Sequence, residues 1–474
     1  MVTMAAGQLL ATARGGDTGV GRREDTVADL MTAAEAAQRL GVKQATLYAY
    51  VSRGVLFRRK AADGRGSLFD AGEVEQLARR GRPRRQAGSA DIVIESAITE
   101  IAGSQLRYRG ADVTDLAVRR SFEDVAWWLW SGRFPATPSQ SVPSQSASAQ
   151  SLSAQSPLAQ SPSPRAWRPE PDAVAAGQAA QAALPPGALL LERLQVIVPA
   201  MAATDPLRLQ LDPPAVMAAG RNMIAGMVEC LPGPGNGSRE VAAGTGAGPA
   251  HGGAAGSAHG GAIAGRLWSQ LAGRRATPAL LGALSAALVL VADHELTAST
   301  LAARVAASVR ADPFAVVATG LGAVAGALHG GASLGAETLL SAAAVPADVP
   351  PVIRDLLRRG ERVPGFGHFV YRAGDPRAAL LLDLVRAAAP RDGRLAVAEA
   401  VRAEVAARGL PGPNIDFALA VLTRVAGMPD GAGEAIFAVG RTAGWIAHAI
   451  EEYARATPPR PRAVYTGPGP AQGS

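Results

Sequence analysis

Apolar and polar positions show no helical period until Asp29, where the first regular pattern of the chain begins. Residues 1–28 are rich in Gly, Thr and charge, so we predict that they are disordered. Thr32-Ala-Ala-Glu35 then fits a capping box, in which a hydroxyl and a carboxylate satisfy the first free amides of a helix. This pattern predicts a helix over Ala33–Leu40 that Gly41 ends.

A second short helix is expected over about Gln44–Arg53, followed by two short apolar runs. Val55–Phe57 and Ser67–Phe69 flank a turn and predict a small hairpin. Asp70 then caps a last helix that runs to about Arg80. Two helices joined by a short turn and followed by a wing form the helix-turn-helix plan. Residues 29–80 resemble the small winged domains of the MerR and excisionase type.

Residues 81–90 are basic, contain a proline and predict a linker. From Asp91 onward the chain consists of long helical segments, interrupted by two low-complexity insertions over 136–164 and 233–261. Neither insertion can bury enough apolar surface to order itself, so we expect mobile surface loops there. Because 48% of residues are hydrophobic but only 4% aromatic, the core must consist mainly of Ala, Leu and Val, which favours an all-α body.

Charge and cysteine content narrow the cellular setting. Cys230 is the only cysteine, which excludes an internal disulfide and suits a reducing cytoplasm. The opening residues do not fit a secretory signal, and apolar stretches such as Pro278–Asp293 are too short to span a membrane. The net charge is +7, and residues 1–90 carry 15 Lys and Arg against 9 Asp and Glu. This asymmetry indicates a polyanionic partner for the N-terminal part.

Five segments place polar side chains within apolar helical stretches. Each has an ordinary interpretation as a cap, a turn or a buried histidine, but three of the six histidines of the chain fall in these segments beside Gly or an acid. The segments are Asp293-His294-Glu295, Leu328-His329-Gly330-Gly331, Pro364 to Arg377, Asn414-Ile415-Asp416-Phe417 and Gly440 to His448.

The order DHEL-x-AST, LHGGA, GFGH-x-VY, DPR, N-I-DF and R-x-x-GWIAH resembles the citrate synthase family over roughly Asp91–Pro470. The resemblance implies an all-α fold with two helical domains. The large domain would comprise 91–330 and 429–474, and the small domain 331–428. The expected protein is a cytoplasmic homodimer that uses acetyl-CoA as a co-substrate and has no permanently bound cofactor.

The resemblance also implies roles for individual residues. Asp416 would take a proton from the acetyl-CoA methyl group, His329 would bind the thioester oxygen, and His368 would polarise the ketone of oxaloacetate. The remaining oxaloacetate ligands would be His294, Arg377, Arg441 and, from the neighbouring subunit, Arg460. The coenzyme A contacts would be Val363, Pro364, Gly365, Gly367 and Arg372.

These residue types suit the chemistry. A methyl group beside a thioester is a weak acid, so a carboxylate can remove its proton only if the developing oxyanion is stabilised at the same time. A neutral imidazole supplies that stabilisation without a metal, and arginines can bind the two carboxylates of oxaloacetate through paired hydrogen bonds. His251 and His259 lie in the Gly-rich insertion without an acidic partner, so no metal site is predicted.

Three functions remain open at this point. The first is citrate synthase, and the second is 2-methylcitrate synthase, which uses propionyl-CoA. Thr297, Ser333 and Gly440 depart from the usual family residues and leave the preferred 2-oxo acid open. The third is a DNA-binding regulator that keeps the synthase fold as a metabolite sensor. Its DNA contacts would come from one helix, through Lys43, Gln44, Thr46, Tyr50 and Arg53.

Overall fold

The computed structural model describes residues 30–42, 44, 47, 51, 56, 58–60, 67–80, 94–134, 167–233, 262–326, 329, 331–372 and 374–455. The chain divides into two compact units, Met1–Val93 and Ile94–Ser474. The disorder predicted for 1–28, the linker predicted over 81–90 and the two predicted insertions, apart from Gly233, lie outside the described residues.

The N-terminal unit consists of short elements around a small apolar core. Its described elements are β1 (Leu30–Thr32), α1 (Ala33–Leu40), β2 (Arg58–Lys60), β3 (Ser67–Asp70) and α3 (Ala71–Arg80). The predicted capping box is confirmed, because the Glu35 amide donates to Thr32 Oγ1 and the Thr32 amide donates to the Glu35 carboxylate. The core is formed by Ala36, Ala37, Leu47, Leu56, Phe69 and Val74.

The predicted hairpin was placed wrongly in its first strand. The strand that pairs with β3 is Arg58–Lys60 rather than Val55–Phe57. Leu56 is instead a buried core residue at a bend, so burial, and not strand pairing, explains this apolar position. The prediction also missed β1, which pairs antiparallel with β3 on its other edge and completes a three-stranded sheet of order β1-β3-β2.

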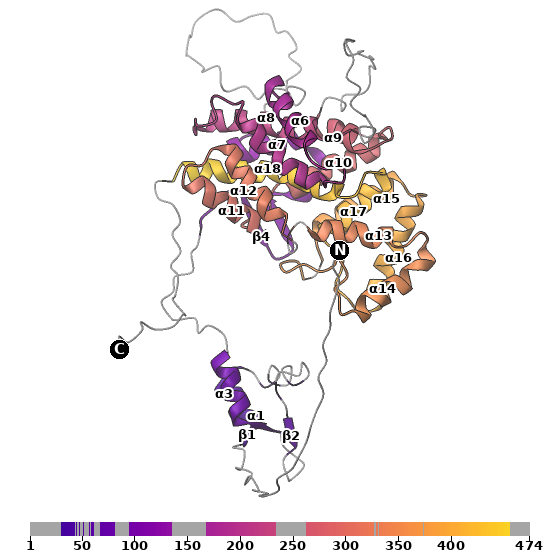
Figure 1. Ribbon diagram of the computed structural model, residues 1–474. Coiled ribbons are helices and arrows are strands. Elements are labelled where there is room, and N and C mark those ends of the chain that lie inside the picture. Colours follow the sequence, from indigo (N-terminus) through magenta and orange to yellow (C-terminus); the bar gives the residue numbers. More distant parts are fainter. Residues whose placement is uncertain are drawn as a thin grey trace, which may run out of the picture. The chain divides into compact units, whose positions relative to one another are not determined.

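The second unit is mainly helical, which confirms the predicted fold class, and it opens with a small antiparallel sheet of order β4-β5-β6 (Figure 1). Its first elements are β4 (Thr99–Ala102), β5 (Gln105–Tyr108), β6 (Ala111–Asp112), α4 (Val113–Arg119), α5 (Phe122–Ser131), α6 (Pro171–Ala182), α7 (Leu190–Ala202), α8 (Pro213–Cys230) and α9 (Ile263–Leu271). These are followed by α10 (Pro278–Val291), α11 (Ala298–Ser308), α12 (Pro313–Val324), α13 (Gly331–Ser341), η4 (Pro346–Asp348), α14 (Val349–Arg358), α15 (Pro376–Ala388), α16 (Gly393–Ala407), α17 (Ile415–Ala426) and α18 (Ala432–Tyr453).

Helix α18 is the centre of this unit and is buried along almost its whole length. It packs against α5, α7, α8, α10, α11, α12, α13 and α17. Two glycines allow the closest of these contacts. A Cβ atom at Gly440 would lie 2.6 Å from Val291 Cγ2, and one at Gly444 would lie 2.3 Å from the Ala292 carbonyl oxygen. Only glycine therefore lets α18 approach the end of α10 so closely.

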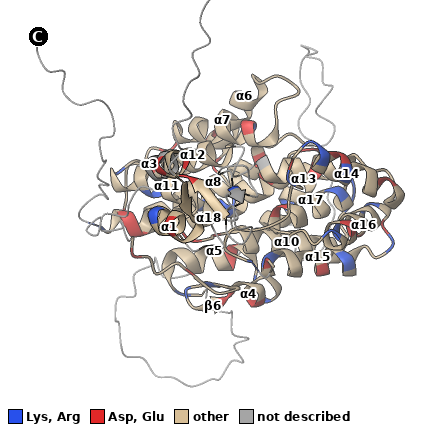
Figure 2. Ribbon diagram, turned by 90° about the horizontal axis from the view of Figure 1, so that it is seen from below, with Lys and Arg blue, Asp and Glu red and all other residues tan. Residues whose placement is uncertain are grey.

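Helices α13 to α17 gather on one side of α18, separate from α6, α7, α8 and α9 (Figure 1). Figure 2 shows Arg, Asp and Glu scattered over α14, α15 and α16, whereas α8 and α18 are mostly uncharged. The predicted division into a large domain and a small domain over 331–428 stays a prediction. Among the described residues, none of the helices combines the length and the apolar character that a membrane crossing requires.

Candidate active site

Two histidines and a tyrosine meet where the turn after α10 faces the loop before α15. His294 follows α10, and its Nε2 lies 2.9 Å from the Tyr371 hydroxyl. The ring centroids of His294 and His368 are 5.3 Å apart. His368 Nδ1 accepts hydrogen bonds from the amides of Val370 and Tyr371, at 3.1 and 3.3 Å. In the neutral imidazole the proton therefore lies on Nε2, which can donate to a ligand.

Two buried arginines lie beside this cluster. The Arg377 guanidinium pairs with Asp375 through Nε and Nη2, at 3.0 and 2.9 Å, and its Cζ lies 5.4 Å from the Tyr371 ring centroid. Arg441 is held by α10 and the turn that follows it, because its Nε donates to the Val291 carbonyl at 2.7 Å and its Nη1 donates to Thr297 Oγ1 at 3.2 Å. Both arginines are almost fully buried, which strengthens their attraction for an anion.

His329 stands at the entrance to α13, between the motif that contains Ser299 and the start of α18. Its Nε2 lies 2.8 Å from Ser299 Oγ. Its ring packs edge-on against Phe437, and the same Phe437 ring lies 4.6 Å from Arg441 Cζ. Phe437 therefore links His329 to the buried guanidinium.

Asp416 lies in the first turn of α17 and is partly buried. Asn414 caps this helix by accepting from the amides of Asp416 and Phe417, and its side-chain amide donates to the Gly367 carbonyl at 3.0 Å. The loop that carries His368 is thereby tied to the helix that carries Asp416. The Asp375 carboxylate adds a second tie, because it accepts from the Ile415 amide at 3.0 Å.

The pKa shifts of these groups have a common electrostatic origin. Burial raises the pKa of Asp416 to about 6, and Asp375 adds to the rise against the opposing effect of Arg377 and Arg441. Burial and Arg441 lower the pKa of His329 to about 4. Burial and Arg377 lower the pKa of both His294 and His368, and Arg441 contributes at His294. Burial is the largest cause at all four groups: together with the guanidiniums it keeps the imidazoles neutral near pH 7, and against them it raises the pKa of the carboxyl.

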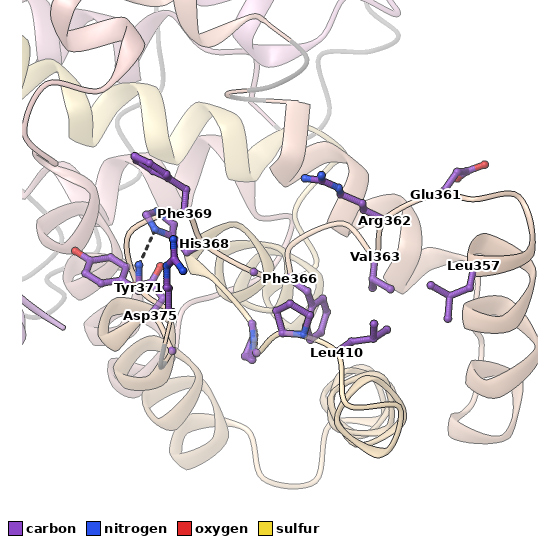
Figure 3. Close-up of a pocket in the computed structure, with 16 residues that line it drawn as sticks. Leu357, Glu361, Arg362, Val363, Phe366, His368, Phe369, Tyr371, Asp375 and Leu410 are labelled. Atoms are coloured by element: carbon purple, nitrogen blue, oxygen red, sulfur yellow. Dashed lines mark hydrogen bonds between the residues drawn. The ribbon is translucent and has the colours of Figure 1, made fainter. Parts of the chain in front are cut away.

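A cavity of about 860 Å³ lies beside His368 (Figure 3). Three of the five predicted coenzyme A contacts line it, namely Val363, Gly367 and Arg372. Pro364 and Gly365 do not. Gly365 has a φ of +78°, and a Cβ there would lie 2.7 Å from Phe417 Cβ, so this position packs against α17. The Phe369 side chain is 91% exposed and lines the cavity next to His368.

Four residues of the site were not assigned roles from the sequence: Ser299, Tyr371, Asp375 and Asn414. All four lie inside the motifs that were singled out, so the signal was present. What was missing was the knowledge that their side chains hold His329, His294, Arg377 and Asp416. His448 is fully buried, and so is Cys230.

The remaining predicted residues fall largely outside the described part of the chain. This applies to Arg460 and to Lys43, Thr46, Tyr50 and Arg53 of the predicted DNA-binding helix. Gln44 is described and is helical and exposed. Within the described ranges there is no group of three or more His, Cys, Asp or Glu side chains that could hold a metal ion.

Comparisons with known proteins agree with this architecture. The family model for the citrate synthase C-terminal domain matches residues 89–232 and 259–462, and a helix-turn-helix domain model matches residues 30–82. Citrate synthase 2 of Bacillus subtilis strain 168 is 38% identical over 202 residues, which is 42% of this chain and 54% of the relative, so the match spans about half the length of that relative. A 2-methylcitrate synthase of Mycobacterium tuberculosis is 29% identical over 404 residues, 81% of this chain and 91% of the relative.

Solved structures show the same fold. Citrate synthase from Pyrobaculum aerophilum superposes with a TM-score of 0.59 at 22% identity, covering 88% of this chain and 96% of the other. Citrate synthase from the archaeon Thermoplasma acidophilum, in a ternary complex with carboxymethyl coenzyme A and oxaloacetate, gives a TM-score of 0.59 at 24% identity over 80% of this chain and 95% of the other. Since the family model matches well over half of the residues of this chain, the chain belongs to the citrate synthase family and carries an N-terminal helix-turn-helix domain.

Proposed function

We propose that the chain is a citrate synthase that condenses acetyl-CoA with oxaloacetate and water to give citrate and CoA. One observation carries the proposal: Asp416, with a raised pKa, and the neutral imidazole of His294 both interact with the buried guanidiniums of Arg377 and Arg441, and His329 interacts with Arg441. This set combines a base, oxyanion donors and carboxylate ligands, which is what condensation of a thioester with a 2-oxo dianion needs.

In the first step, Asp416 removes a proton from the methyl group of acetyl-CoA. Its pKa of about 6 leaves it ionised near neutral pH and makes it a stronger base than an ordinary aspartate. The Ser299 hydroxyl can donate to His329 Nε2, which leaves the imidazole proton on Nδ1. That N–H would then donate to the thioester oxygen as the enolate forms.

In the second step, the enolate carbon attacks the ketone carbon of oxaloacetate. The proton on His368 Nε2 is available for the ketone oxygen, because Nδ1 is occupied by two backbone amides. Arg377 and Arg441 would bind the carboxylates, and His294 would bind beside them. Water then attacks the thioester carbonyl of the product, and CoA leaves as the thiol.

The co-substrate would occupy the cavity beside His368. Its lining includes the cations Arg362 and Arg372 and the apolar side chains of Val363, Phe366 and Leu410. Cations suit the phosphates of coenzyme A, and apolar walls suit its pantetheine arm. Closure of the predicted small domain over the large one would exclude water from the enolate.

A homodimer is part of the proposal. Leu301, Val305 and Val309 follow a four-residue spacing along and just beyond α11, and their side chains are 43%, 51% and 68% exposed. Such an apolar stripe on one helix face is typical of a surface that a second copy covers. Arg460 would then reach the oxaloacetate site of the neighbouring subunit.

The test is release of free CoA from acetyl-CoA and oxaloacetate by the purified full-length chain, measured with a thiol reagent. Cys230, the only cysteine, is buried and should contribute little background. Turnover that disappears in Asp416→Ala supports the proposal, and absence of turnover in the parent chain contradicts it. Faster turnover with propionyl-CoA would instead identify a 2-methylcitrate synthase. Both acyl-CoAs must be compared, because one methylene changes binding by only about 1–3 kcal/mol.

For the N-terminal unit we propose DNA binding. The match to a helix-turn-helix domain supports it, as do the exposed Gln44 on a helical segment and the exposed Arg58 on β2. Fluorescence anisotropy of the full-length chain with duplex DNA should show binding that weakens with salt and with Arg58→Glu. Specific DNA binding without any CoA release would favour the regulator over the enzyme.

A further inference from the structure

A buried polar network lies directly behind the turn that carries His294. Asp293 is fully buried, and its Oδ2 accepts from the Thr99 hydroxyl at 2.5 Å and from the Glu295 amide at 3.2 Å. The Tyr108 hydroxyl lies 2.9 Å from both the amide nitrogen and the carbonyl oxygen of Asp293. Side chains from the small sheet therefore fix both the backbone and the carboxylate of the residue before His294.

The third contact to the Asp293 carboxylate comes from α18. His448 Nε2 lies 3.3 Å from the Asp293 carboxylate, and its Nδ1 lies 2.5 Å from Arg304 Nη1. A guanidinium can only donate, so Nδ1 must accept and the proton must lie on Nε2. His448 is thereby held in the single tautomer that donates to Asp293.

Arg304 is fixed in turn at the end of α18. Its Nε donates to Glu452 Oε1 at 2.7 Å, and its Nη1 donates to Glu451 Oε2 at 2.8 Å. Arg304, His448 and Asp293 are all fully buried. A buried ionic network adds little net stability compared with an apolar core of the same volume, so stability alone does not account for this one.

The backbone reinforces the same turn. The Gly444 amide donates to the Ala292 carbonyl at 3.0 Å, and the absence of a side chain at Gly444 permits this approach. Glu295, two residues after Asp293, has a φ of +55°, a conformation that non-glycine residues rarely adopt. A turn with such a residue persists only where several surrounding contacts hold it in that conformation.

We propose that His448, oriented by Arg304, is a positioning residue for the oxo-acid site: through Asp293 it fixes the turn on which His294 meets the substrate. This inference rests on the proposed function, because His294 is taken there as an oxaloacetate ligand. A displaced His294 weakens binding of the oxo acid, whereas the cavity beside His368 lies on a different loop and keeps its affinity for acetyl-CoA.

The experiment compares His448→Leu, His448→Gln and Thr99→Val in the full-length chain. Calorimetric affinity for oxaloacetate and the KM values for both substrates are measured. His448→Leu should weaken oxaloacetate binding about 10- to 100-fold, since loss of one hydrogen bond to a charged ligand changes affinity by about that factor. His448→Gln keeps a donor and an acceptor and should recover most of the affinity, and Thr99→Val should lie between this variant and the leucine variant.

Tyr453→Phe is the matched control, because it removes one partly buried hydrogen bond from α18, to the Ala311 carbonyl, outside the network. The inference is overturned if Thr99→Val and the folded His448 variants bind oxaloacetate as the control does, or if they lose affinity for both substrates alike. Normal turnover in the parent chain with no selective effect of these variants would sink the inference alone. If the variants lose oxaloacetate binding selectively but the parent chain never releases CoA, only the proposed enzyme activity is contradicted.

Discussion

The two binding regions of the proposed enzyme are built in opposite ways. His294, Arg377 and Arg441, around the oxo-acid site, are buried and are held by hydrogen bonds to side chains or backbone. The cavity assigned to coenzyme A is lined by a loop on which Arg372 and Phe369 are exposed. One region is preorganised, and the other presents side chains that only a ligand or a closing domain would cover.

The difference follows from what each ligand demands. A small dianion offers few contacts, so its site must hold charged groups in place before binding, and buried dipoles and ions do this without reorganisation. Coenzyme A is long and offers many contacts, so it can order a loop as it binds. Substitutions in the buried region should therefore have large effects on a single step, and those at the cavity mouth should have small ones.

Asp416→Asn should have the largest effect, because the proposed mechanism assigns removal of the methyl proton to this carboxylate. We expect kcat to fall about 10²- to 10⁴-fold, as for loss of a general base. Because burial raises the pKa of Asp416, ionisation of this carboxyl destabilises the folded state above pH about 6. The amide variant should then unfold at no lower a temperature than the parent at pH about 8, and a lower unfolding temperature there would contradict this burial argument.

Arg441→Lys should come next, with a loss of about 100-fold in kcat/KM for oxaloacetate. Lysine cannot reproduce the planar fork, and a hydrogen bond to a charged group contributes about 1.5–3 kcal/mol. The KM for acetyl-CoA is the internal control and should change little. An equal rise in both KM values would mean that the two regions are not independent.

The sequence revealed the chemical groups of this site better than their supports. The motifs singled out His294, His329, His368 and Asp416, and the structure shows these residues on helix ends and loops. They could not reveal that Ser299 contacts His329 or that Thr99 contacts Asp293, because those contacts join residues 30 and 194 positions apart. Short-range pattern carries no information on such pairs.

The N-terminal unit teaches the same lesson about local pattern. The capping box at Thr32 was predicted correctly because all of its atoms lie within four residues. The first strand of the wing was misplaced because Leu56, an apolar residue, was assigned to the strand although it belongs to the core. Hydrophobic periodicity over three residues cannot separate these alternatives.

The pH dependence of kcat/KM should reflect the ionisation of Asp416, the base of the buried region. Asp416 must be deprotonated to act, so kcat/KM for acetyl-CoA should be full above pH about 6 and fall about tenfold per unit below it. The pKa of His329 is lowered to about 4, so this imidazole stays neutral over the same range and adds no second limb. Rates measured in buffers of constant ionic strength would test this, and a midpoint near the ordinary aspartate value would contradict the assigned environment.

Arg372→Ala at the cavity mouth should have the smallest effect. The side chain is exposed, and exposed charge pairs contribute about 0.2–1 kcal/mol, so we expect the KM for acetyl-CoA to rise only about two- to fivefold while kcat is kept. The difference should shrink at high salt, because exposed charges are screened. Arg358→Ala is the matched control, since Arg358 is exposed on α14 and pairs with Asp355 but does not line the cavity. A fall in kcat as large as that of Arg441→Lys would show that the mouth is part of the preorganised site after all, and the contrast between the two regions would fail.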